Sequence, residues 1–209
     1  MKILAVSQIK EADAFTIANE PIASIDLMER AANICFAWIQ RNIGRNKSYK
    51  IFCGTGNNGG DGLAIARMMA GKNISVETFV VRFSEKSSDD FATNYKELIK
   101  LKKIKVTDIN TASDLPEIKE SDIIIDAVFG SGLSKPVSQG IAAEVIKHIN
   151  KSKATVVAID IPSGLFGEDN SENTGEIIQA KHTRHFSFRN LLFCLQEMKN
   201  LLGRGKYCQ

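Results

Sequence analysis

The sequence predicts an α/β fold in which helices cover both faces of a mostly parallel sheet. Short apolar segments alternate with segments of helical periodicity, and the apolar segments are nearly continuous, which is typical of strands buried on both faces. The expected strands are residues 50–53, 74–81, 103–107, 122–128 and 154–159. The expected helices between them are residues 60–70, 88–101 and 139–149. No repeat or linker interrupts this order, so we expect one domain over residues 1–209.

Two further helices are expected before the first strand. Ser7 is expected to cap a helix that ends near Pro21, and Ser24 to cap a second one. Farther along, Gly71 fits a helix C-cap and Ser88 a helix N-cap. The first two helices offer a broad apolar face, formed by Ile9, Phe15, Ile17, Ile25, Met28, Phe36, Trp38 and Ile39. That face suits a dimer interface or burial within the chain. Apart from such an interface, we expect Trp38 and the phenylalanines to lie in the hydrophobic core.

Composition excludes several classes of protein. The net charge of +3 with scattered lysines does not indicate nucleic-acid binding. No signal peptide is visible and no apolar run is long enough to span a bilayer, so we expect a cytoplasmic protein that does not bind membranes. The four cysteines lack metal-site or disulfide spacing, and we expect Cys35 and Cys53 to be buried, reduced thiols.

The most informative segment is GTGNNGGDG, residues 54–62, between an expected strand and an expected helix. Its glycines at positions 54, 56 and 59 match the dinucleotide-binding pattern G-x-G-x-x-G and allow close approach of a ligand to the main chain. The segment also carries polar side chains, namely Asn57, Asn58 and Asp61. A carboxylate beside a pyrophosphate is repulsive, so these residues predict a loop that coordinates a ligand itself.

Two later strands also end in chemically active residues. The fourth ends at Asp126 and continues as AVFGSGLSKP, and the fifth ends at Asp160 and continues as IPSGL. Since the carboxyl ends of parallel strands meet at one edge of a sheet, the three segments should converge there. The side chains expected to meet are Asn58, Asp61, Asp126, Asp160 and Ser163.

Each feature taken alone has a plainer interpretation. Either aspartate could stabilise a turn, and a lone glycine pattern occurs often by chance. The dispersed histidines do not suggest a zinc site. We expect solvated side chains for His148 and His182, and a packing or surface role for His185. The combination of three such strand ends favours a functional site.

Three motifs together resemble one known family. GTGNNGGDGLAIAR (54–67), DAVFGSGLSKP (126–136) and DIPSGL (160–165) are similar to the NAD(P)H-hydrate epimerases, the YjeF N-terminal domain family. The resemblance covers residues 1 to about 180, and the stretch 182–209 departs from the family's usual threonine-rich strand and lysine-containing turn. It implies a Rossmann-like three-layer α/β/α sandwich, a homodimer, and one potassium ion per subunit.

The resemblance also implies a role for each matching residue. The implied substrate-binding residues are Asn57, Asn58, Gly59, Gly60, Asp61, Gly130, Ser131, Gly132, Leu133, Ser134, Lys135, Pro136 and Asp160. The implied potassium ligands are Asn58, Asp126 and Ser163. Asp160 is the implied acid/base, a role that suits a partly desolvated carboxyl with a raised pKa. Amide, carboxylate and hydroxyl oxygens suit an alkali cation.

The implied reaction interconverts the R and S forms of hydrated NADH or NADPH (NADHX, NADPHX) at C6 of the nicotinamide ring. The nucleotide is then the substrate rather than a cofactor. The implied functional partner is an S-specific, ATP- or ADP-dependent dehydratase, which could be a further domain of a longer chain. One alternative is a non-catalytic nucleotide-binding or dimerisation scaffold of the same fold. A dehydrogenase would need an acidic residue closing the second strand, and Glu77 lies too early. A P-loop NTPase lacks its Gly-Lys-Ser/Thr.

Overall fold

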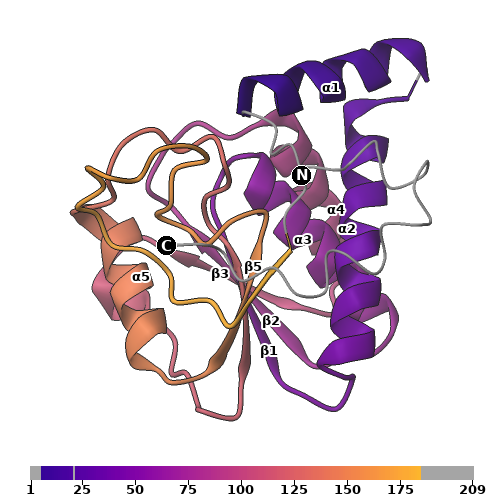
Figure 1. The fold of residues 1–209 in the computed structure, drawn as a ribbon. Coiled ribbons are helices and arrows are strands. Elements are labelled where there is room, and N and C mark those ends of the chain that lie inside the picture. The colour runs from indigo at the N-terminus through magenta and orange to yellow at the C-terminus, as the bar shows by residue number, and fades with distance from the viewer. Residues whose placement is uncertain (1–5, 21, 185–209) are drawn as a thin grey trace.

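The computed structural model describes residues 6–20 and 22–184, and these form a six-stranded, all-parallel sheet with helices on both faces (Figure 1). The strand order is β3-β2-β1-β4-β5-β6. The strands are β1 (Tyr49–Cys53), β2 (Val76–Val81), β3 (Lys105–Ile109), β4 (Ile123–Ala127), β5 (Thr155–Ile159) and β6 (His182–Arg184). The helices are α1 (Val6–Asn19), α2 (Ser24–Asn42), α3 (Asn57–Gly71), α4 (Asp89–Lys100), η1 (Ala112–Asp114) and α5 (Gly140–Lys151). The predicted α/β sandwich is confirmed.

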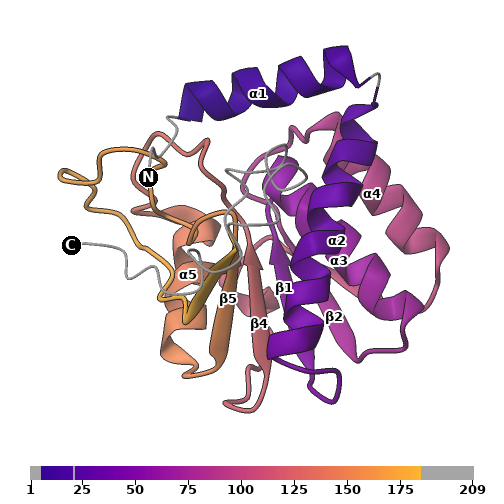
Figure 2. The same ribbon diagram turned by 45° about the vertical axis from the view of Figure 1, so that its right-hand side comes forward.

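The helices divide into two layers around the sheet. Helices α2, α3 and α4 cover one face and α5 covers the other, while α1 crosses beyond the ends of the strands (Figures 1 and 2). One apolar core lies between the sheet and α2 and α3, and a second lies between the sheet and α5. Every residue of β1 and of β4 is buried, because these central strands are covered on both faces.

Helix α3 begins earlier than the sequence suggested. Residues 57–59, which precede the expected helix of residues 60–70, form the first turn of α3, so the connection after β1 is only residues 54–56. Glycines permit this because the helix start packs directly on the strands. A Cβ at Gly59 would lie 1.8 Å from the carbonyl oxygen of Gly54, and one at Gly62 would lie 2.7 Å from Cys53 Sγ.

Three of the four predicted helix caps were wrong. Helix α1 begins at Val6, so Ser7 is inside it, and Ala23 precedes the first residue of α2. The Ser24 hydroxyl instead donates to Asp90 Oδ2 (2.7 Å). Gly71 is the last residue of α3 rather than its cap. Ser88 is confirmed, since its Oγ accepts the Phe91 N–H at the start of α4 (3.2 Å).

Several expectations about burial also changed. Phe15 on α1 is 68% exposed rather than in the core, and Trp38 on α2 is only partly buried. His148 Nε2 lies 2.8 Å from the Pro116 carbonyl oxygen, and His182 packs edge-on against Trp38, so neither is simply solvated. Burial lowers the pKa of His182. His185 lies outside the described residues. Cys35 and Cys53 are buried, as expected, and neither is in a disulfide.

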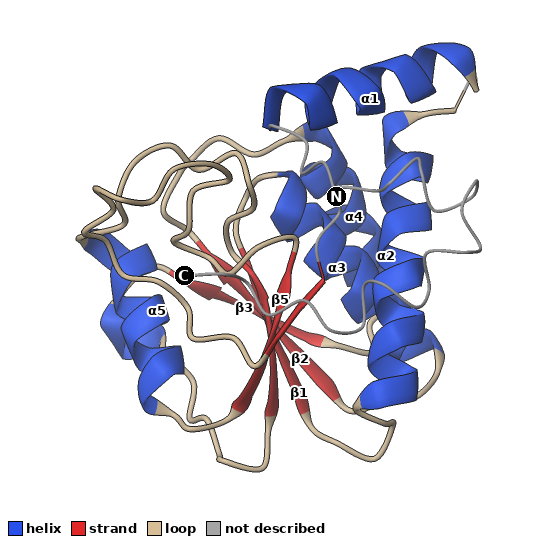
Figure 3. Cartoon of the chain, viewed as in Figure 1, coloured by secondary structure: helices blue, strands red, loops and turns tan. Residues whose placement is uncertain are grey.

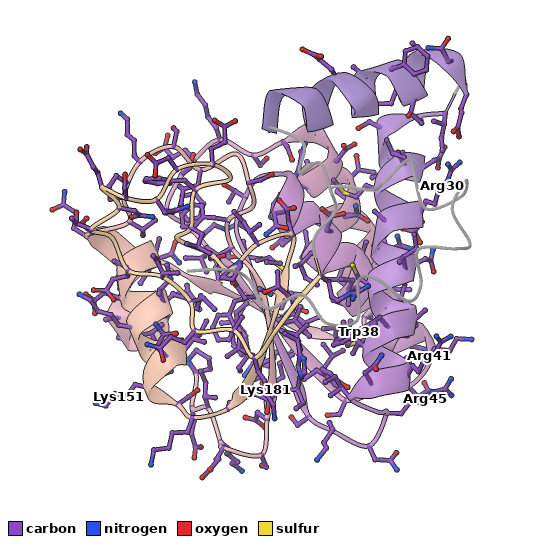
Figure 4. The ribbon with its side chains drawn as sticks, in the orientation of Figure 1. Arg30, Trp38, Arg41, Arg45, Lys151 and Lys181 are labelled. Atoms are coloured by element: carbon purple, nitrogen blue, oxygen red, sulfur yellow. The ribbon has the colours of Figure 1, made fainter. Side chains whose placement is uncertain are left out.

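Arginine side chains lie on the outer side of α2, which faces away from the sheet. Arg30, Arg41 and Arg45 point away from the fold along this helix and the turn after it (Figure 4). Trp38 lies on the other side, where the Arg184 guanidinium of β6 is 4.8 Å from the centre of its ring. Helix α2 therefore contacts β6 through a cation–aromatic interaction. No helix within residues 6–20 and 22–184 is long and apolar enough to cross a membrane.

The close approach of α3 to the strand end gives a first prediction. Gly59→Ala should lower the free energy of unfolding by about 3 kcal/mol or more, because the new methyl would collide with backbone that cannot move aside. Gly71→Ala is the matched control at the other end of the same helix, where a Cβ would meet nothing within 4 Å. It should change stability by less than about 1 kcal/mol. Urea denaturation of both variants measures this, and equal stabilities would contradict the packing described.

Candidate functional site

The loops that follow β1, β4 and β5 lie together at one edge of the sheet. These strands are neighbours in the order β1-β4-β5, and their loops gather beyond the carboxyl ends of the strands (Figure 3). In open parallel sheets this edge is where ligands bind. Four of the five side chains predicted to meet there do so: Asn58, Asp126, Asp160 and Ser163.

A buried pair, Asp126 and Ser163, joins β4 to the loop after β5. Asp126 is fully buried, between Phe52 of β1 and Ala158 of β5. The Ser163 N–H donates to Asp126 Oδ2 (2.8 Å) and the Ser163 hydroxyl donates to Oδ1 (2.5 Å). Burial raises the pKa of Asp126 to about 6, although the bonds from Ser163 act in the opposite direction. The pair thus fixes the spacing of two strand ends in the core.

Phe129 extends this arrangement toward α3. Its N–H donates to Ser163 Oγ (2.8 Å), and its carbonyl accepts a hydrogen bond from Asn58 Nδ2 (2.8 Å). The other amide atom, Asn58 Oδ1, is buried and has no hydrogen-bond partner. An unsatisfied buried oxygen costs about 1–3 kcal/mol, which a bound donor or cation would recover. The backbone of Phe129 therefore holds an amide whose oxygen remains available to a ligand.

Asp160 follows β5 in an unusual backbone conformation. Its φ is +67°, in the left-handed region that few residues other than glycine adopt readily. Its Oδ2 accepts the Ser131 N–H (2.7 Å), and its own N–H donates to the Arg184 carbonyl (2.8 Å). A Cβ at Gly130 would lie 2.7 Å from Asp160 Oδ2 and 3.3 Å from Asn58 Cβ. Gly130 therefore lies between Asn58 and Asp160 and brings them close.

The remaining predicted site residues surround this centre. Asp61 is buried in α3 near Cys53, where burial raises the pKa of the thiol and the charges of Asp126 and Asp61 raise it further. Asn57, the first residue of α3, lines a separate cleft of about 400 Å³ with Ser24 and residues 87–90. After Asp126, the loop residues Gly132, Ser134, Lys135 and Pro136 are exposed, while Gly130, Ser131 and Leu133 are partly buried.

Two contributors were missed by sequence reasoning. The backbone of Phe129 connects Asn58 to Ser163, but a backbone role leaves no mark in the residue type. Phe83, after β2, has its ring centre 4.7 Å from that of Phe129, and a single phenylalanine after an apolar strand gave no signal. Glu77 is excluded as the ribose-binding acid of a dehydrogenase, because it is the second residue of β2 and pairs with Lys50 Nζ (2.5 Å).

The donor atoms are those that suit an alkali cation. Asn58, Asp126 and Ser163 offer amide, carboxylate and hydroxyl oxygens, and the amide oxygen is buried without a partner. Residues 6–20 and 22–184 contain no cluster of three or more His, Cys, Asp or Glu side chains suited to a transition metal. The residues present fit the expected potassium ion.

The fold and the polar cluster define a doubly wound α/β protein with a candidate ligand site at the carboxyl edge of its sheet. A family model described as "YjeF-related protein N-terminus" matches residues 24–190. The chain belongs to this family, as its motifs predicted.

Curated relatives resemble the chain over most of its length. It is 36% identical over 206 residues to the NAD(P)H-hydrate epimerase of Limosilactobacillus fermentum, covering 96% of this chain and 93% of that protein. It is 34% identical to the bifunctional NAD(P)H-hydrate repair enzyme Nnr of Thermofilum pendens, covering 98% of this chain but only 38% of that enzyme. The crystal structure of the yeast protein YNL200c has the same fold, with a TM-score of 0.70 at 21% identity, covering 88% of this chain and 79% of that one.

The buried pair gives a second prediction. Ser163→Ala removes the hydroxyl that donates to Asp126 and accepts from Phe129, so two buried polar groups lose partners. We expect the free energy of unfolding to fall by about 2–3 kcal/mol. Ser171→Ala, in an exposed loop where the hydroxyl contacts only Asp169, is the control and should stay within about 0.5 kcal/mol of wild type. Chemical denaturation compares them, and an unchanged midpoint for Ser163→Ala would refute the role of the pair.

Proposed function

We propose that the chain is an NAD(P)H-hydrate epimerase that interconverts the R and S forms of hydrated NADH and NADPH. The observation that carries the proposal is the position of Asp160, whose Oδ2 accepts the Ser131 N–H (2.7 Å) beside Asn58 and Gly130. The carboxyl thus lies beside two segments to which the family resemblance assigns substrate binding. The names of the curated relatives agree with it.

The chemistry requires one acid/base beside the reduced ring. The hydrate carries a hydroxyl at C6, next to the ring nitrogen. Protonation of that hydroxyl allows the nitrogen lone pair to expel it as water, leaving a planar iminium. Water that returns to the opposite face, with loss of a proton, gives the other epimer, and no electrons are gained or lost overall.

Asp160 is the residue suited to move these protons. A protonated Asp160 carboxyl donates to the departing hydroxyl, and the resulting carboxylate accepts a proton from the returning water. The Ser131 N–H fixes the orientation of the carboxyl. The buried surroundings, with Asp160 only 8% exposed, limit competition from bulk water.

The two flanking segments bind the rest of the substrate. The start of α3 presents the backbone N–H groups of residues 57–59, which precede the first hydrogen bond within the helix, and helix N-termini attract phosphate. The 130–136 loop adds the flexible cation of Lys135, which suits the diphosphate. Asp61 lies deeper, and its carboxylate excludes phosphate from the interior side of the helix start.

Potassium would be held by Asn58, Asp126 and Ser163, where its charge offsets the Asp126 carboxylate and the negative substrate.

We further propose a cytoplasmic homodimer. Its product passes to an S-specific dehydratase, in keeping with the bifunctional repair enzymes among the relatives. Whether NADHX or NADPHX is preferred depends on contacts distant from the reacting ring.

The decisive experiment follows the approach to equilibrium of a sample enriched in one epimer of hydrated NADH. Proton NMR should show a rate well above the spontaneous one for the wild type, and a fall of at least about 100-fold for Asp160→Asn. Asn can still accept the Ser131 N–H, so the fold should be retained. Asp169→Asn, in an exposed loop, is the matched control. Spontaneous rates with the wild type, combined with nucleotide binding, would instead support a non-catalytic scaffold.

Potassium binding is testable without activity. Adding KCl in place of choline chloride at equal ionic strength should raise the melting temperature by about 2–4 °C for each kcal/mol of binding energy. Asn58→Ala should abolish this shift, since it removes the unpaired Oδ1. Asn33→Ala, on the exposed side of α2, should keep it. An equal potassium response of wild type and Asn58→Ala would remove Asn58 from the cation site.

A further inference from the structure

An exposed aromatic side chain, that of Phe83, lies beside the proposed active site, and the proposed mechanism does not use it. Phe83 is 38% exposed and follows β2 by two residues. The other exposed large apolar side chains among the described residues lie elsewhere. Ile99 and Leu101 are at the end of α4, which leads to the opposite edge of the sheet, and Phe15 is on α1. Phe83 alone in this group follows a strand at the ligand-binding edge.

The ring of Phe83 is held against the site rather than loose in solvent. Its centre is 4.7 Å from that of the Phe129 ring, and the two planes are inclined by 35°. A Cβ at Gly54 would lie 3.2 Å from Phe83 Cε1, so the glycine leaves room for the ring. The backbone of Phe129 is in turn bonded to Asn58 and Ser163. Phe83 is thereby linked to the proposed cation-binding residues through one neighbour.

The segment around Phe83 is also fixed. Arg82 Nε donates to Asp108 Oδ1 (2.9 Å), and its guanidinium lies 5.3 Å from the centre of the Tyr95 ring. The Ser88 N–H donates to the Thr55 carbonyl (3.0 Å), which joins the β2–α4 connection to the loop after β1. The partly exposed aromatic side chain is therefore pre-positioned, and little conformational entropy is lost when a ligand covers it.

We infer that Phe83 is a substrate-binding residue on which the adenine base of the hydrated dinucleotide stacks, an inference that rests on the proposed function. A fixed aromatic ring with an exposed face binds a planar base by stacking, and every base offers such a face. The substrate has two rings joined by a diphosphate, so one position on the protein is required for each.

The order of the strands assigns the two rings. Asp160 follows β5 and Phe83 follows β2, with β1 and β4 between them. At about 4.8 Å per strand, the axes of β2 and β5 are roughly 14 Å apart, which suits the two ends of an extended dinucleotide. The loops after β1 and β4, proposed for the diphosphate, occupy the middle. With the nicotinamide ring at Asp160, the adenine lies at Phe83.

The test uses two probes that each contain one half of the substrate. Phe83→Ala should weaken binding of ADP-ribose about tenfold in calorimetry and leave binding of nicotinamide mononucleotide unchanged. In the epimerisation assay it should raise KM by a similar factor with kcat unaltered. Phe83→Leu keeps apolar bulk against Phe129 and should behave like the alanine variant, whereas Phe83→Tyr should retain affinity. Leu101→Ala, with 37% exposure at the opposite edge, is the matched control.

The outcomes separate this inference from the proposed function. Wild-type affinity of Phe83→Leu for ADP-ribose would overturn the stacking role, as would failure of the wild type to bind ADP-ribose. An equal loss for nicotinamide mononucleotide would overturn the assignment of adenine to this ring. A third result would be a wild type that binds ADP-ribose but does not catalyse epimerisation. If the Phe83 variants of that protein lose ADP-ribose binding, the stacking role is supported and the epimerase proposal is refuted.

Discussion

The site depends on a hydrogen-bonded pair that is wholly inside the protein. Asp126 and Ser163 connect the ends of β4 and β5, and the backbone of Phe129 carries the connection to Asn58 on α3. A carboxylate in such surroundings is stable only when its oxygens have donors or a cation nearby. The groups that hydrogen-bond to Asp126 therefore also position the loops at the candidate ligand site. One cluster thus contributes both to stability and to the proposed binding of ligand.

Glycines allow α3, the end of β1 and the loop after β4 to pack closely around this cluster. The contact of Gly59 with Gly54 seats the first turn of α3 on the end of β1, and Gly130 lies between Asn58 and Asp160. These three glycines serve by the absence of a side chain, and none of them has a positive φ. The glycine pattern seen in the sequence thus reports helix-to-strand packing as well as room for a ligand.

The sequence was sufficient for the order of elements and for most of the site, because both follow from local patterns. Continuous apolar strands indicate a parallel sheet, and parallel strands bring Asp126 and Asp160 to one edge whatever the details of packing. The start of α3 was misplaced because glycine and asparagine weaken helix propensity, and tertiary contacts override it. Phe83 and the backbone of Phe129 escaped notice because their importance arises only from what folding places beside them.

The left-handed backbone conformation at Asp160 restricts which amino acids can occupy this position. Asparagine, aspartate and glycine enter that conformation most easily, since a short polar side chain can bond locally, while longer or branched residues enter it at greater expense. Glutamate, the other carboxylic acid, would meet this backbone restriction and would also carry its oxygens one bond farther, away from the Ser131 N–H. Main-chain geometry therefore restricts the choice of residue for the proposed acid/base as much as the proposed reaction does, which limits the substitutions that this position can accept during evolution.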